Sequence, residues 1–103
     1  MSEQEEQERI ARELAEELRR LKVEDVVISV LLQLSQIGYR RLGLTEQTKE
    51  DRDLGQARLA IETMKSLVPV LDQVVPAELV RDFASAVANL QLAYAKVATE
   101  AGG

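Results

Sequence analysis

Apolar residues recur at alternating intervals of three and four through most of the second half of the chain. The longest run is Leu54, Ala57, Ile61, Met64, Val68, Leu71 and Val75, and a second is Leu79, Phe83, Ala86, Leu90, Ala93 and Val97. An α-helix places residues at these intervals on one face, whereas a half-buried strand alternates at every second residue. The spacing therefore predicts an all-α protein with helices at about 49–75 and 76–99.

Two prolines interrupt this region. Pro69 lies inside the longer run, where it removes an amide donor and clashes with the carbonyl group of Lys65. Because the apolar spacing continues to Val75, we expect a kink at Pro69 rather than the end of the helix. Pro76 suits the first position of the last helix, and Thr48 suits the cap of the helix before it.

The most apolar segment, VVISVLLQL at residues 26–34, admits three interpretations. Its β-branched residues favour a strand, but its apolar residues do not alternate and no βαβ pattern surrounds it. The fourteen residues between Asp25 and Arg40 would cover about 21 Å as a helix, which is short of the roughly 30 Å of a membrane core. A polar stripe at intervals of four, three and four indicates a helix at about 23–42, with Gly43 as the residue that terminates it. The stripe consists of Ser29, Gln33, Gln36 and Arg40.

Charged residues dominate the first 22 positions, where the apolar residues form only a narrow stripe. The stripe consists of Ile10, Leu14, Leu18 and Leu21, with Ala11 and Ala15 beside it. Ser2 suits an N-cap, with glutamates in the following turn. We expect a helix at about 3–22 that acts as a coiled-coil-like arm seeking a partner helix, either separate from the next helix or continuous with it. The chain then divides into an arm at 1–22 and a helical bundle domain at 23–103.

The helix at 23–42 carries more apolar surface than two antiparallel neighbours can cover. An uncovered patch of roughly several hundred Å² usually marks an interface. We therefore expect a three-helix antiparallel bundle with an additional N-terminal helix, completed by a homodimer or a higher symmetric oligomer. The expected interface residues, besides the arm, are Val26, Val27, Val30, Leu31, Leu34, Gln33 and Gln36. The polar stripe is either the exposed edge of the helix or a buried hydrogen-bonding seam between two copies.

The composition argues against several classes of function. The 103 residues include no His and no Cys, so the commonest general base, thiolate chemistry and zinc-binding spacings are missing. The net charge of −5 repels the nucleic-acid backbone, which argues against nucleic-acid binding. We expect no catalytic, cofactor or metal site. No signal segment is visible in MSEQEEQERI, and we expect a cytoplasmic protein without a membrane contact. One polar or basic end remains as a candidate contact, formed by Tyr39, Arg40 and Arg41.

The order of motifs also resembles a known family. RRLGL is followed by a polar loop, then by DLGQARLAIETMKSL, a turn, and PAELVRDFASAVANLQLAYAKV. The matching features are Leu42-Gly43, Asp53 to Ala57, Ile61-x-x-Met64, Pro76 and Glu78. Over about residues 23–96 the chain resembles the bacterial domain-of-unknown-function family 1844. The resemblance implies a small cytoplasmic helical domain behind a charged, variable N-terminal extension, and it implies no catalytic residue.

We therefore expect a non-enzymatic, homo-oligomeric module that binds another protein. Two alternatives stay open. The first is a carrier of a small molecule or lipid tail, with an apolar pocket between helices near Pro69. The second is an RNA-associated accessory protein that uses the end formed by Arg40 and Arg41.

Overall fold

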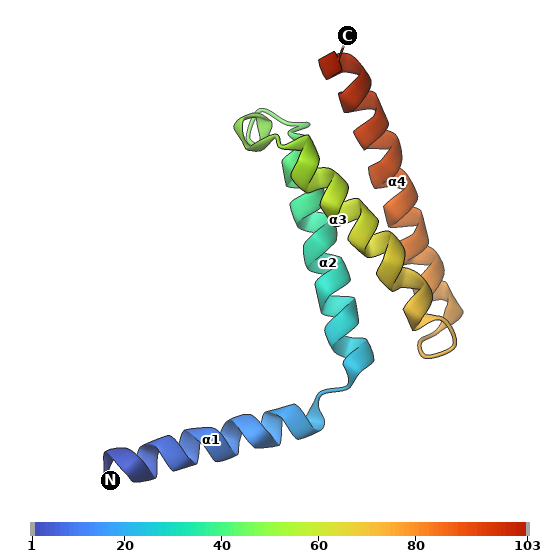
Figure 1. Ribbon diagram of the computed structural model, residues 1–103. Helices are drawn as coiled ribbons and strands as arrows, with labels where there is room; N and C mark the ends of the chain where they lie inside the picture. The colour runs from blue at the N-terminus through green and yellow to red at the C-terminus, as the bar shows by residue number, and fades with distance from the viewer. Residues whose placement is uncertain (1, 103) are drawn as a thin grey trace.

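The computed structural model describes residues 2–102, and the side chains of residues 2–100. Over these residues the secondary structure consists of α-helices and short 3-10 turns, without a strand (Figure 1). The α-helices are α1 (Glu3–Arg20), α2 (Val23–Leu42), α3 (Leu54–Leu67) and α4 (Ala77–Gly102), and the 3-10 turns are η1 (Lys49–Asp51) and η2 (Val68–Leu71). The prediction of an all-α protein is confirmed.

Three of the helices, α2, α3 and α4, pack against one another and run in alternating directions (Figure 1). Their shared core is apolar, and no polar or charged side chain is buried among the described residues. The core cluster consists of Leu31, Leu42, Ala57, Ile61, Met64, Val68, Leu71, Phe83, Val87 and Leu90. Removing this set from water is the main favourable contribution to folding.

A glycine lies where α2 meets both of its neighbours. A methyl group at Gly38 would stand 3.5 Å from Cδ2 of Leu90 on α4 and 3.6 Å from Cβ of Ala60 on α3. Leu90 is fully buried and Ala60 nearly so. These are ordinary van der Waals distances, so a methyl group at Gly38 would fit at the three-helix contact.

Arginine side chains fasten the segment between α2 and α3. Gly43 ends α2 in the left-handed conformation, with φ 62°, as predicted. Arg52 donates from Nε to the carbonyl oxygen of Leu42 at 2.9 Å and from Nη2 to that of Gly43 at 3.0 Å. These bonds satisfy carbonyl groups that the end of a helix leaves without a partner.

The third helix begins later than predicted. Thr48 does not cap it, because the Thr48 hydroxyl bonds with that of Thr45 at 2.9 Å and residues 49–51 form only η1. Asp53 caps α3 instead, accepting a hydrogen bond from the backbone N–H of Gln56 at 3.1 Å. Thr and Asp are both good N-cap residues, so residue type alone did not distinguish the two positions.

The third helix also ends earlier than predicted, and the expectation of a kink at Pro69 is wrong. α3 stops at Leu67 and Pro69 lies in η2. The proline has no N–H for the α-helical bond and crowds the carbonyl group one turn back. Val68 and Leu71 remain 6% and 2% exposed, because the 3-10 turn still directs them toward the core. The apolar spacing therefore continues past the end of the α-helix, because residues of the 3-10 turn are buried as well. Pro76 stands just before α4, where its carbonyl accepts from the N–H of Leu79 at 3.0 Å.

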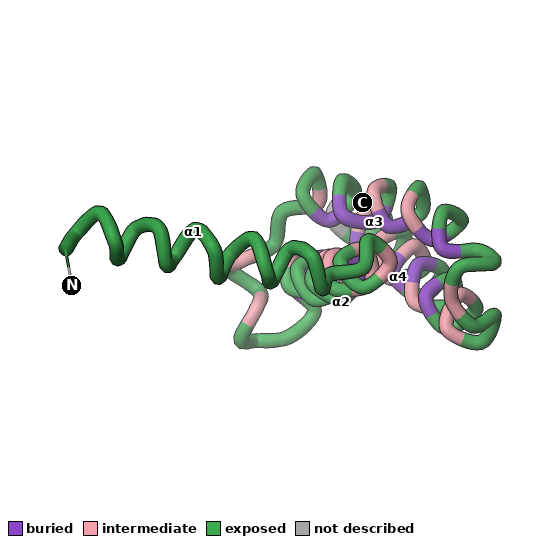
Figure 2. The backbone as a smooth tube through the Cα atoms, turned by 90° about the horizontal axis from the view of Figure 1, so that it is seen from below, coloured by how far each residue is buried: buried purple, intermediate pink, exposed green. Residues whose placement is uncertain are grey.

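The N-terminal helix lies apart from the other three. None of the residues of α1 is buried, and Figures 1 and 2 show it projecting away from the bundle. The Ser2 hydroxyl accepts a hydrogen bond from the N–H of Glu5 at 3.2 Å, as expected of an N-cap. Leu21 (φ −73°, ψ 132°) and Lys22 (φ −97°, ψ 140°) are extended. α1 and α2 are therefore two helices joined by a two-residue link, not one continuous helix.

Candidate protein-interaction surface

α2 presents one buried face and one exposed face. Leu31, Gly38 and Leu42 are its buried residues, and their intervals of seven and four place them on one side of the helix. α3 and α4 cover this side. The polar stripe lies on the uncovered side, where all four of its residues are exposed within a single chain.

The predicted interface residues differ in how far their own chain covers them. Val26 is 45% exposed, and Gln33 and Gln36 are also exposed, whereas the half-buried residues are Val27, Val30 and Leu34. Leu31 is 0% exposed. The expectation that Leu31 contributes to an interface is wrong, because α3 and α4 of the same chain already cover its side chain.

Two exposed apolar residues on the same side of α2 as Val26 were not among the predicted interface residues. Val23 is 79% exposed and Ile37 is 48% exposed. Together with Val26 and the half-buried Val30 they stand at intervals of three, four and seven, so they form a row along one side of α2. We call these four residues the α2 strip. This row has the same helical spacing as the core residues of α2. Only the positions of α3 and α4 show which residues form the core and which form the exposed row.

A second exposed row runs along α1. Its four large apolar residues are between 48% and 69% exposed, and they are Ile10, Leu14, Leu18 and Leu21. We call them the α1 seam. In Figure 2 the whole of α1 has the colour of exposed residues, in contrast to the bundle. The narrow stripe predicted from the sequence therefore has no partner within its own chain.

The basic end of α2 binds the segment between α2 and α3. Arg40 forms an ion pair with Asp51, with Nη1 2.8 Å from Oδ2. Arg41 donates from Nη1 to the backbone oxygen of Asp51 at 3.2 Å. Tyr39, the third predicted residue of this end, is 40% exposed. These bonds give both arginines a structural role at the end of the helix.

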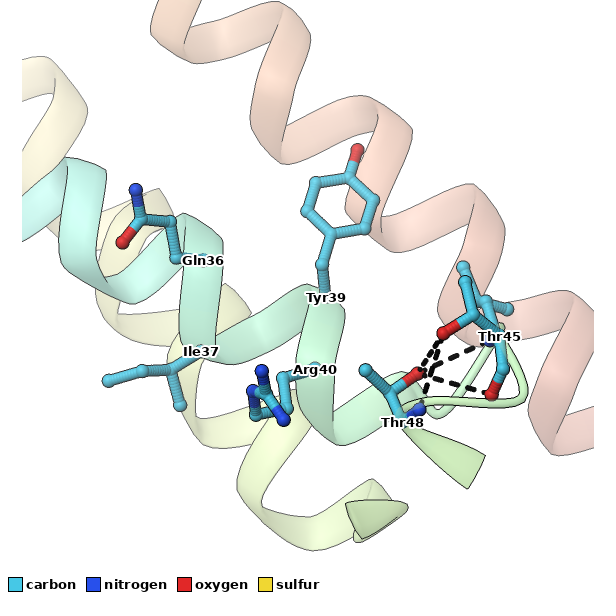
Figure 3. A pocket seen from close by; sticks show the side chains of 7 residues that line it. Gln36, Ile37, Tyr39, Arg40, Thr45 and Thr48 are labelled. Carbon is cyan, nitrogen blue, oxygen red and sulfur yellow. Dashed lines mark hydrogen bonds between the residues drawn. The ribbon is translucent and has the colours of Figure 1, made fainter. Parts of the chain in front are cut away.

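A hollow of about 550 Å³ adjoins the basic end. It is open to solvent, and its lining residues are Gln36, Ile37, Tyr39, Arg40, Leu44, Thr45 and Thr48. Figure 3 shows Tyr39 and Ile37 leaving α2 in different directions, with Thr45 and Thr48 bonded to each other on the far side. Since its lining side chains spread apart, the hollow is a surface depression and not an enclosed binding site.

A smaller groove of about 220 Å³ lies beside Pro69, between the end of α3 and α4. Its lining is mainly small and apolar and includes Val68, Ala84 and Ala88. Pockets that enclose small molecules typically measure about 300–1,000 Å³. The groove lies where the carrier alternative expects a pocket, but it is small and open.

Within the described residues, no three acidic side chains lie close enough together to hold a metal ion. No helix in the same part of the chain is both long and apolar enough to cross a membrane. Comparisons with protein-family models, with curated proteins and with solved structures found no match to this chain.

Proposed function

We propose that this protein is a non-enzymatic, homo-oligomeric interaction module of the cytoplasm, whose assembled form binds another protein. One observation carries the proposal: the α1 seam and the α2 strip have no covering partner within one chain. Single apolar residues are common on protein surfaces, whereas contiguous rows of them mark contact sites. Each of these rows has the spacing with which one helix packs against another.

The stability of α1 supports the same conclusion. Most of the stability of a helix in a protein comes from packing its apolar side, because the helix propensity of the residues contributes little by itself. The 18 residues of α1 have no buried member. A partner that covers the α1 seam would supply the missing contribution.

The alternatives have less support. A carrier needs an enclosed apolar space, and the groove beside Pro69 measures about 220 Å³ and is open. An RNA-associated protein needs a strongly basic surface, whereas Asp51 is bonded to both Arg40 and Arg41 in a chain of net charge −5. Membership of the family that the sequence resembles is also a proposal, and it rests on the residue pattern over 23–96.

A matched pair of charge substitutions tests the proposal. Ile37→Glu places a charge in the α2 strip, and Leu92→Glu places one on α4, where Leu92 is 71% exposed and outside both rows. Light scattering over a range of concentrations should give the mass of a dimer or larger assembly for the full-length protein. Ile37→Glu should raise the dissociation constant at least about tenfold, which corresponds to roughly 1.4 kcal/mol, and Leu92→Glu should leave it unchanged. A wild-type chain that stays monomeric at its highest soluble concentration would exclude self-association.

A further inference from the structure

The structure points to an exchange of arms: we propose that α1 of each copy lies antiparallel along the α2 strip of a second copy. One contact, made twice in a closed two-fold dimer, then covers both exposed rows. The inference rests on the proposed self-association. It adds which surfaces meet, in which direction, and that they come from different chains.

The two rows have matching spacing. Counted outward from Lys22, Leu21 and Val23 stand one position away, Leu18 and Val26 stand four away, and Leu14 and Val30 stand eight away. An antiparallel pair of helices in this register therefore brings three residues of the α1 seam opposite three residues of the α2 strip. Further along, Ile10 stands opposite the half-buried Leu34.

The charges fix the direction of the pair. α1 begins with Glu3, Glu5 and Glu6 in its first turn, and α2 ends with Arg40 and Arg41. An antiparallel arrangement brings these opposite charges together. A parallel arrangement would instead place the glutamates beside Glu24 and Asp25, the acidic first turn of α2, and like charges in contact are unfavourable.

Glutamates at the start of α1 also suit the dipole of their own helix, so only those beside the seam bear on the partner. Glu3 and Glu6 lie seven and four residues before Ile10, on the side of the seam, whereas Glu5 lies on the opposite side of α1. Oε1 of Glu6 also lies 3.7 Å from Nη2 of Arg9 on the same helix, and both side chains of this pair are exposed to solvent. The chain thus contains a test residue and a matched control within one turn.

The link explains why the two rows do not meet within one chain. Leu21 and Lys22 are both extended, and α1 projects away from the bundle (Figure 1). A helical hairpin would need the chain to reverse within these two residues. A short link that holds two complementary surfaces apart favours exchange between identical chains.

Pairing of α1 with α1, or of α2 with α2, is the competing arrangement. Either one covers a single row and leaves the other exposed. The exchanged arrangement covers both, and the arms then occupy the uncovered side of α2, beside the polar stripe.

Cysteine cross-linking distinguishes these arrangements directly, because the chain contains no Cys. The full-length variants Leu14→Cys and Val30→Cys are prepared separately, mixed, allowed to exchange subunits and mildly oxidised. The exchanged dimer brings Leu14 opposite Val30 of the partner, so the expected product is the mixed disulfide, identified by its mass. Leu14→Cys or Val30→Cys homodimers as the main product would overturn the exchange while leaving self-association intact. No cross-link from a mixture that light scattering shows to be dimeric would also overturn it.

A longer link provides a second, independent measurement. Inserting four residues, Gly-Ser-Gly-Ser, after Lys22 allows α1 to fold back on its own α2. The dissociation constant should then rise at least about tenfold, since the same contacts form within one chain at a high effective concentration. The helix content should stay the same. An unchanged dissociation constant would contradict the exchange.

The charge contribution is tested by Glu6→Arg against Glu5→Arg. Both substitutions reverse a charge near the start of α1, but only Glu6 lies beside the seam. Since each dimer contains the contact twice, Glu6→Arg should weaken dimerisation about three- to tenfold more than Glu5→Arg. Equal effects of the two variants would show that these charges do not direct the pairing.

Discussion

α1 and α4 carry the same kind of apolar pattern and have opposite surroundings. Phe83, Leu90 and Val97 of α4 are between 0% and 6% exposed, whereas Leu14 and Leu18 of α1 are 55% and 69% exposed. The spacing of apolar residues therefore shows which side of a helix needs cover. It does not show whether that cover comes from the same chain.

The largest expected effect comes from shortening one leucine in each helix. Leu90→Ala removes a fully buried side chain and should lower the free energy of unfolding of the bundle by about 2–5 kcal/mol, through lost burial and a cavity. Leu18→Ala should change it by less than about 0.5 kcal/mol at concentrations where the chain is monomeric. Denaturant unfolding followed by circular dichroism measures both. Comparable losses would mean that α1 packs on the bundle.

A smaller effect is expected from adding a methyl group at either of two glycines of the bundle. Gly43 has φ 62°, and a Cβ there would meet Cβ of Arg52 at 2.8 Å. Gly43→Ala should therefore cost about 1–3 kcal/mol of bundle stability. At Gly38 the nearest atom lies at an ordinary contact distance of 3.5 Å, and Ala gains up to about 1 kcal/mol in helix propensity.

Gly38→Ala should thus be as stable as the wild type or slightly more so. The same denaturant experiment compares the two variants. A Gly43→Ala protein as stable as Gly38→Ala would show that neither the backbone conformation nor Arg52 constrains the end of α2.

The smallest effect is expected from removing one N-cap in each region. Asp53→Ala leaves the N–H of Gln56 without its acceptor and should cost the bundle about 1 kcal/mol. Ser2→Ala removes the corresponding bond to Glu5, but the unfolding of the bundle should not change. Amide hydrogen exchange should instead show faster exchange at the start of α1. A loss of bundle stability in Ser2→Ala would contradict the separation of the two regions.

The helical class, the position of α2 and the apolar core were predictable because burial repeats with the period of the helix. The helix ends were harder. Pro69 ended α3 although the buried spacing continued through Val68 and Leu71, because a 3-10 turn also places these side chains in the core. Asp53 rather than Thr48 caps α3. The position of this cap depends on the hydrogen bonds by which Arg52 holds the segment before α3 to Leu42 and Gly43.

The interface prediction failed at Leu31 for a different reason. Apolar residues surround much of α2, and only the positions of α3 and α4 decide which of them are covered. Val26 was predicted to be accessible and is, whereas Leu31 faces α3 and α4 and is fully buried. The two-residue link had no clear sequence signal, since Leu21 and Lys22 are both compatible with a continuous helix.

The bundle interior holds no polar side chain among the described residues. No side-chain hydrogen bond ties one interior position to another within these residues, so exchanges among Leu, Ile, Val and Met that keep the volume should cost less than about 1.5 kcal/mol each. Gly43 lacks this freedom, because its backbone conformation and the nearby Arg52 constrain it. A lineage of such proteins can therefore drift through most of its interior sequence while its shape, and the places where its chain turns, stay the same.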